Sequence, residues 1–186
     1  MAIQRRHAAS SVSVRSPHQR SRALAAAGSA AFLLLAPGVV AGLVPYLLTD
    51  WKMDDAPLAV RIVGGTSIGV GVAFLLHAFA RFVIDGLGTP APVAPPERLV
   101  VGGIYRYVRN PMYLAVEATI VGQALLLGQP WLLAYAAGIG AVFVGFVRLY
   151  EEPTLRRRFG DQYDAYRRAV PGWLPRLTAW RPGDQS

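Results

Sequence analysis

The chain lacks cysteine entirely, and its 186 residues include a single lysine, Lys52. Without cysteine the protein forms no disulfide, uses no catalytic thiolate and binds no zinc through thiolate ligands. Charge is also scarce: 16% of the residues are charged, compared with about 25% in an average soluble domain. Hydrophobic residues make up 53% of the chain, so their distribution decides the class of protein.

The hydrophobic residues are concentrated in four runs. Residues 23–48 and 130–147 contain no charged residue, and Glu117 is the only charge between residues 111 and 128. A helix that rises 1.5 Å per residue needs roughly 17–25 apolar residues to cross the hydrocarbon core of a bilayer. We therefore predict an all-α integral membrane protein, a bundle of four transmembrane helices. Their predicted ranges are 23–48, 58–83, 111–128 and 130–150.

Basic and non-basic segments alternate between these runs. The tail 1–22, the loop 84–110 and the tail 151–186 are basic, whereas the first loop is acidic and the turn around Gln129 is uncharged. The positive-inside rule then places both termini and the basic loop in the cytoplasm. This distribution accounts for the net charge of +8, so we expect no nucleic-acid partner.

Three parts of the chain follow from these patterns. We expect a disordered basic tail over 1–22, a transmembrane domain over 23–150 and an interfacial tail over 151–186. Eighteen arginines against one lysine, with much alanine and glycine, are typical of a GC-rich genome. The expected location is therefore a bacterial inner membrane.

The C-terminal tail carries a helical pattern of apolar residues. We predict an amphipathic helix along the cytoplasmic interface, with Trp173 and Trp180 as anchors at the level of the lipid headgroups. The residues that share its apolar face, at spacings of 4, 4, 3 and 4, are Leu155, Phe159, Tyr163, Tyr166 and Val170.

The stretch GGIYRYVRNPMY, residues 102–113, places charged and phenolic groups next to membrane-length apolar runs. Asn110-Pro111 is a favourable helix start, with Asn capping free backbone N–H groups and Pro at the first helical position. The N-terminus of a helix attracts anions, and Arg106 and Arg109 add full positive charge. Arginine and tyrosine are also ordinary residues of a membrane interface, so composition alone leaves both interpretations open.

The pair Glu151-Glu152 favours the interpretation that residues 102–113 form a functional site. The turn Gly128-Gln129-Pro130 is so short that the third and fourth runs must form an antiparallel hairpin. The two carboxylates at the end of the fourth run then lie near Arg106, Arg109 and Asn110. They either close the hairpin through a salt bridge or form the negative side of a pocket for a zwitterionic or polyhydroxyl cofactor.

Three further residues are candidates for the substrate side. Arg148 lies one turn before Glu152 and either faces a substrate anion or extends to the membrane surface. His77, at the cytoplasmic end of the second run, either packs there or faces the pocket. Glu117 lies inside the third run, where a carboxyl group is costly and marks a functional site by default; a hydrogen bond to a neighbouring helix is the simpler account.

Two separated motifs, GxYRYVRNPMY and EEPTLRRRFGDQYDAYRRAVPGWLPR, resemble those of membrane methyltransferases. This family includes isoprenylcysteine carboxyl methyltransferases and phospholipid N-methyltransferases, and the resemblance covers roughly residues 74–176. It implies S-adenosylmethionine as the methyl donor and no metal. Asn110 stands where the carboxyl methyltransferases usually have histidine.

The resemblance and the residue patterns described above together give the candidate roles. Those expected to bind the cofactor are Glu97, Arg98, Leu99, Val100, Tyr105, Arg106, Asn110, Pro111, Met112, Tyr113, Glu151 and Glu152. Those with candidate catalytic roles are Arg109, Arg148 and Glu152, and those on the substrate side are Arg148, His77 and Glu117.

The expected activity is methyl transfer to a lipophilic acceptor: an isoprenoid-linked carboxylate, a phospholipid amine or a small hydrophobic thiol. Such an in-line displacement needs alignment of the reactants and exclusion of water rather than a nucleophilic residue. An NADPH-dependent reductase of the sterol-reductase type is an alternative, because those proteins share an Arg-x-Pro-x-Tyr signature. They usually carry Asn-Tyr where this chain has Met112-Tyr113. A non-enzymatic bundle is the third alternative.

Overall fold

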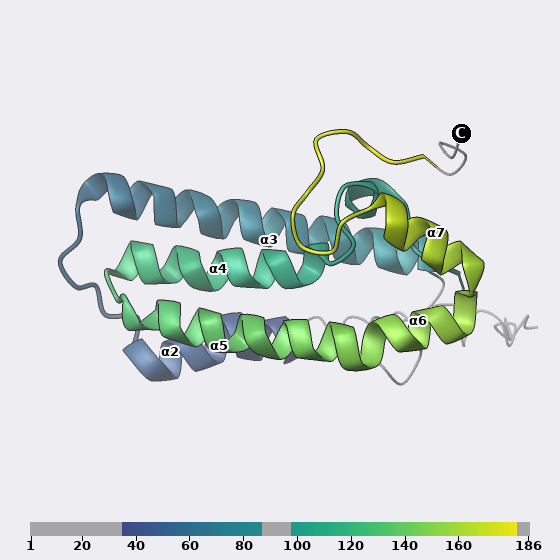
Figure 1. Ribbon diagram of the computed structural model, residues 1–186. Coiled ribbons are helices and arrows are strands. Elements are labelled where there is room, and N and C mark those ends of the chain that lie inside the picture. The colour runs from purple at the N-terminus through teal and green to yellow at the C-terminus, as the bar shows by residue number, and fades with distance from the viewer. Residues whose placement is uncertain (1–34, 87–97, 182–186) are drawn as a thin grey trace, which may run out of the picture.

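The computed structural model describes residues 35–86 and 98–181, and all regular secondary structure in these two ranges is helical. A helix over Leu35–Thr49 contains the π-helical segment Val39–Leu43 and α2, Val44–Thr49. It is followed by α3 (Leu58–Gly86), a 3-10 turn at Gly103–Arg106, α4 (Pro111–Leu127) and α5 (Trp131–Phe146). A π-helical turn at Val147–Glu151 leads into α6 (Glu152–Phe159), and α7 (Asp161–Ala169) is the last helix of the described residues (Figure 1).

Helices α3 and α4 pack closely because small residues line their contact. A Cβ atom added to Gly64 would lie 2.6 Å from the carbonyl oxygen of Gly122, and one added to Gly71 would lie 2.7 Å from the Thr119 hydroxyl. The Ser67 hydroxyl donates a 2.8 Å hydrogen bond to the Ala118 carbonyl across the same contact. The two backbones therefore approach more closely than larger residues would allow.

Helices α4 and α5 form the expected antiparallel hairpin, with Gly128 in the left-handed conformation at φ 69° between them. The hairpin also holds the first helix. The Gln123 side-chain amide donates to the Ala41 carbonyl at 2.7 Å, and the Tyr135 hydroxyl donates to the Val40 carbonyl at 2.8 Å. Both acceptors lie in the π-helical segment, where the regular hydrogen-bond pattern changes.

The loops are divided between two ends of the bundle. At one end, the loop between α2 and α3 contacts the hairpin turn, with the Asp54 amide donating to the Leu127 carbonyl at 2.7 Å. At the other end lie residues 98–110, α6 and α7 (Figure 1). This partition agrees with the expected alternation of basic and non-basic segments, because the described parts of two basic segments, 98–110 and 151–181, share one end.

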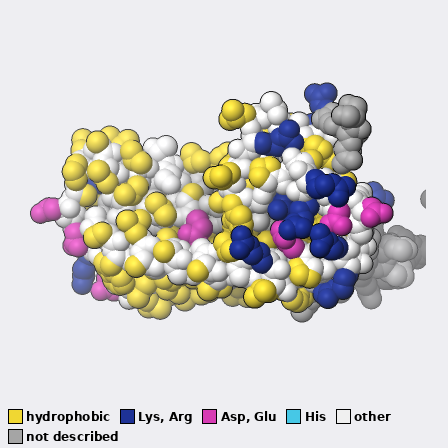
Figure 2. All heavy atoms as spheres, viewed as in Figure 1, with side chains coloured by type: hydrophobic (Ala, Val, Ile, Leu, Met, Phe, Trp, Pro, Cys, Tyr) yellow, Lys and Arg dark blue, Asp and Glu magenta, His cyan; other side chains and the backbone are white. Residues whose placement is uncertain are grey.

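Within residues 35–86 and 98–181, two helices are long and apolar enough to cross a membrane, Leu58–Arg81 and Trp131–Phe159. Only 11% and 17% of their most apolar windows are buried within the protein, unlike the core helices of a soluble domain. Figure 2 shows hydrophobic side chains over much of the bundle surface, with most of the Lys and Arg side chains in view gathered towards the end that carries α6 and α7. Leu35–Thr49 and Pro111–Leu127 are shorter apolar helices. The first part of the predicted first span, 23–34, lies outside the described residues.

The prediction of a single amphipathic tail helix is wrong. The fourth apolar helix does not end at residue 150 but continues through α6, and Gly160, at φ 51° and ψ −128°, breaks the chain before α7. The five predicted apolar residues nevertheless pack into one cluster with Trp180. Trp180 is 8% exposed and its ring centroid lies 5.5 Å from that of Tyr166, so it belongs to this core and is no headgroup anchor.

Candidate active site

The segment that precedes α4 is held by backbone hydrogen bonds to the C-terminal tail. The Arg109 amide donates to the Pro171 carbonyl at 2.9 Å, and the Trp180 amide donates to the Arg106 carbonyl at 3.0 Å. The Arg106 side chain also donates to the Trp180 carbonyl, at 2.6 Å. The Arg106 side chain therefore binds the C-terminal tail. It does not contact Glu151 or Glu152, although the antiparallel hairpin predicted that these residues lie near each other.

Arg109 is the centre of the contact between the tail and the start of α4. Its Nη1 atom donates to Glu152 Oε1 at 2.6 Å and to the Tyr163 hydroxyl at 3.1 Å, and its Nε atom donates to the Val170 carbonyl at 2.9 Å. Arg167 reaches the second oxygen of Glu152 at 3.3 Å. The side chains of Arg109 and Glu152 are only 13% and 17% exposed. This charge-assisted network has the expected polarity, basic just before α4 and acidic where α6 begins.

Glu151 has a different partner from its neighbour. The Tyr113 hydroxyl, in the first turn of α4, donates a 2.8 Å hydrogen bond to Glu151 Oε2. The Tyr113 ring centroid lies 4.8 Å from that of Phe143 and 6.3 Å from that of Trp173. One glutamate therefore binds a cation and the other a phenol in an aromatic setting.

Asn110 is the N-cap residue of α4, as expected, but its side chain makes no capping hydrogen bond, so that part of the prediction is wrong. Its backbone is at φ −115° and ψ 52°, outside the extended region that N-cap residues typically adopt. The side chain is 7% exposed, and its Nδ2 atom is buried without a hydrogen-bond partner within residues 35–86 and 98–181. An Nδ2 donor at this position is a group that a ligand can satisfy.

Tyr105 is buried beside this network. It packs with Ala78 and Val100, and its carbonyl accepts a 2.6 Å hydrogen bond from the Tyr166 hydroxyl. Burial raises the pKa of the Tyr105 phenol far above its ordinary value, and Tyr166 and Glu151 raise this pKa further. The phenol is therefore protonated at neutral pH and remains a hydrogen-bond donor.

Residues 98–101 lie between α3 and the tail. Leu99 and Val101 pack against the tail core, while Val100 packs in the cluster that contains Tyr105, and Met112 adjoins that cluster. Of the remaining predicted cofactor residues, Pro111 is buried and Arg98 is exposed. Glu97 lies outside the described residues.

The three substrate-side candidates lie in different surroundings. A Cβ atom added to Gly103 would lie 3.0 Å from His77 Nε2, so His77 is next to the loop that leads to α4. Glu117 faces Gly140 of α5, and its Oε1 atom is buried without a hydrogen-bond partner in the described residues. Arg148 is exposed, and in the described part of the chain no ion pair or hydrogen bond fixes its side chain.

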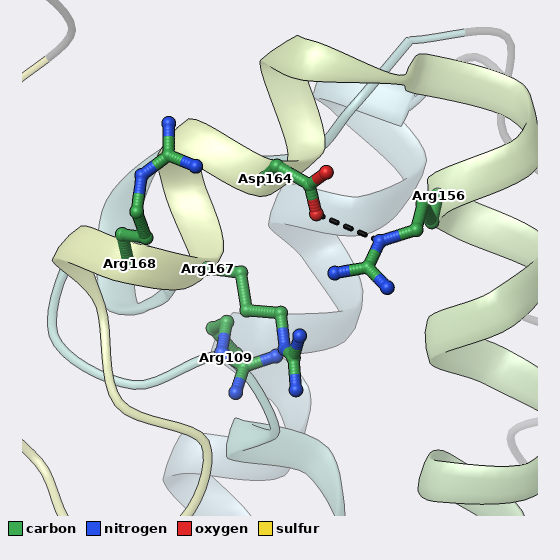
Figure 3. A pocket seen from close by; sticks show the side chains of 5 residues that line it. All are labelled: Arg109, Arg156, Asp164, Arg167 and Arg168. Carbon is green, nitrogen blue, oxygen red and sulfur yellow. Dashed lines mark hydrogen bonds and ion pairs between the residues drawn. The ribbon is translucent and has the colours of Figure 1, made fainter.

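A pocket of about 360 Å³ opens beside Arg109, on the tail side of the network (Figure 3). Four of its five lining residues are arginines, and the fifth is Asp164, which accepts a 2.8 Å hydrogen bond from Arg156 Nε. Sequence reasoning missed this pocket, and it also missed Tyr163, Arg167 and Trp173 as neighbours of the glutamate pair. The basic and aromatic composition of residues 151–186 was the sequence signal that could have indicated this pocket and these residues.

Residues 59–162, more than half of the chain, match the phospholipid methyltransferase family. The chain belongs to this family. Its members are membrane methyltransferases that depend on S-adenosylmethionine. Membership of the phospholipid methyltransferase family confirms the resemblance drawn from the two motifs. It also favours methyl transfer over the reductase and over the non-enzymatic bundle.

The names of three relatives contain three different methyl acceptors. The chain is 27% identical to a phosphatidylethanolamine N-methyltransferase of Schizosaccharomyces japonicus, over 63% of this chain and 14% of that protein. It is 27% identical to methanethiol S-methyltransferase 1 of Bradyrhizobium diazoefficiens, over 74% and 48%. It is 36% identical to a protein-S-isoprenylcysteine O-methyltransferase of Schizosaccharomyces pombe, over 41% and 33%. The match spans less than half of the length of each relative.

Proposed function

We propose that this protein is a membrane methyltransferase that transfers a methyl group from S-adenosylmethionine to a lipophilic acceptor. The acceptor is an isoprenoid-linked carboxylate, a phospholipid amine or a small hydrophobic thiol, the three classes named by the relatives. The observation that carries the proposal is the pairing across the hairpin: Glu152 with Arg109, and Glu151 with Tyr113.

The residues at this contact fit the chemistry of the cofactor. Carboxylates such as Glu151 match the two ribose hydroxyls, and the unpaired Nδ2 donor of Asn110 matches the carboxylate of the methionine part. Trp173 and Phe143, close to Tyr113, offer aromatic faces to a nucleobase. Arg109 already binds Glu152, Tyr163 and Val170, so its proposed role is to position Glu152.

When bound, S-adenosylmethionine supplies an electrophilic methyl group on a sulfonium. The protein then has to align the acceptor and exclude water. Tyr105 and Val100, both buried, close the site from the side of α3. Glu117 lies one turn after Tyr113 in α4 and faces Gly140 of α5. We assign it to the acceptor side of the site, with His77 and Arg148 nearer the surface.

The proposal includes the arrangement in the membrane. Four spans, about 23–48, 58–83, 111–128 and 130–150, would place residues 84–110 and 151–186 together in the cytoplasm of a bacterial inner membrane. The shared end of the basic segments supports this topology. A lipophilic acceptor would then enter from the bilayer and the polar cofactor from the cytoplasm.

Calorimetric titration of the detergent-solubilised protein with S-adenosylhomocysteine, and separately with NADPH, tests the proposal. We expect saturable binding of S-adenosylhomocysteine, weakened about tenfold by Glu151→Gln and by Asn110→Ala, since each removes a polar contact worth ~1.5 kcal/mol. Tyr150→Phe, at an exposed tyrosine next to Glu151, is the matched control. Binding of NADPH without binding of S-adenosylhomocysteine would refute the proposal.

A further inference from the structure

Apart from Arg109, which positions Glu152, no residue that lines the pocket beside Arg109 has a role in the proposed methyl transfer. Its arginines come from three places: Arg109 precedes α4, Arg156 lies on α6, and Arg167 and Arg168 lie on α7. In Figure 3 the guanidinium groups of Arg109 and Arg167 lie in the centre, Arg156 is on one side and Arg168 is on the opposite rim. Segments far apart in the sequence thus bring four cations to one cavity.

The carboxylates near this pocket do not balance its charge. Arg156 is paired with Asp164, and Arg109 and Arg167 share Glu152. Four arginines against two carboxylates leave a surplus of two positive charges. In Arg156 and Arg167 the Nε atom is the one that has a partner within the described residues, at 2.8 and 3.3 Å. The two terminal nitrogens of each of these guanidinium groups therefore remain available to a ligand.

We infer that this pocket binds a phosphate group, and that the site is separate from the proposed cofactor site. Guanidinium forks match the oxygens of a phosphate in bidentate geometry, and a phosphate monoester carries about two negative charges at neutral pH, which equals the surplus. Neither Tyr113 nor Glu151, which form the contact proposed for the cofactor, is among the residues that line the pocket. The inference goes beyond the proposed methyl transfer.

The position of the pocket indicates where the phosphate comes from. Helix α6 is the last part of the long helix Trp131–Phe159 and follows the uncharged run 130–147. We therefore place the pocket at the level of the lipid headgroups. A phosphorylated lipid headgroup and a free phosphate compound present the same chemistry to the arginines. Tighter binding of the lipid is expected, because its acyl chains gain contact with the exposed apolar surface next to α6.

The test uses the full chain in a non-ionic detergent, titrated with dihexanoyl phosphatidic acid and with inorganic phosphate. The double variant Arg156→Gln/Arg168→Gln should weaken binding of both probes about tenfold or more. The matched control is Arg157→Gln/Arg158→Gln, which removes the same charge from exposed positions of α6 outside the pocket and should change affinity less than about twofold.

The outcomes are distinct. Phosphatidic acid bound at least about tenfold more tightly than inorganic phosphate assigns the site to lipid headgroups, and equal affinity assigns it to a soluble phosphate compound; both support the inference. Absence of saturable binding of both probes, or equal losses in the two double variants, would overturn it. Competition by S-adenosylhomocysteine would also overturn it, because the pocket would then belong to the cofactor site. Binding of phosphate without binding of S-adenosylhomocysteine would instead refute only the proposed methyl transfer.

Discussion

Replacing Glu152 by Gln isolates the charge of the network around Arg109. The variant keeps an acceptor oxygen but removes the carboxylate that binds Arg109 at 2.6 Å and Arg167 at 3.3 Å. Loss of one partner from a buried ion pair costs ~3–5 kcal/mol. The cost here is smaller because the side chains are 13% and 17% exposed and Arg109 keeps its bonds to Tyr163 and Val170. We expect the free energy of unfolding to fall by about 2 kcal/mol.

This loss is measurable as a fall in the melting temperature in detergent. For a chain of this size it corresponds to roughly 6 °C, read from intrinsic fluorescence. The control is Asp164→Asn, which breaks the ion pair with Arg156; those side chains are 29% and 55% exposed, and exposed pairs contribute about 0–1 kcal/mol. If both variants melt at the same temperature, Glu152 is not the electrostatic centre of the contact.

Two further predictions concern packing. Gly122→Ala should lower the melting temperature by several degrees, because its Cβ would lie 2.8 Å from the carbonyl oxygen of Gly64 and overpacking costs ~1–3 kcal/mol. The control Gly65→Ala, whose Cβ would meet nothing within 4 Å, should leave the melting temperature unchanged. Equal effects of the two variants would contradict the close contact between α3 and α4. Tyr166→Phe leaves the buried carbonyl of Tyr105 without its 2.6 Å donor, so it should cost about 1–3 kcal/mol in denaturant unfolding; an unchanged midpoint would count against this bond.

The hairpin and its polar end were predictable because their signals are local. Gly128 and Pro130 mark a turn too short for any other connection, and the glutamate pair and Arg109 lie at matched ends of the two apolar runs. Opposite charges at the same level of an antiparallel hairpin predict that Arg109 contacts the glutamate pair. The partition of the loops between two ends followed in the same way from the distribution of arginine.

The path of the tail was not predictable from its periodicity. The apolar spacing continues across Gly160, and only the positive φ of that residue separates α6 from α7. Part of the docking of the tail is by backbone hydrogen bonds, such as Arg109 to Pro171 and Trp180 to Arg106, which leave no side-chain signature. For the same reason Trp180 looked like an interfacial anchor, whereas tertiary packing on Tyr166 buries it.

The docking of residues 170–180 onto residues 106–110 has a consequence for biosynthesis. A growing polypeptide that contains every apolar helix up to Phe159 still lacks residues 170–180, which form one wall of the candidate site. On the proposed function, we therefore expect a polypeptide that stops before residue 170 to bind S-adenosylhomocysteine much more weakly than the full chain.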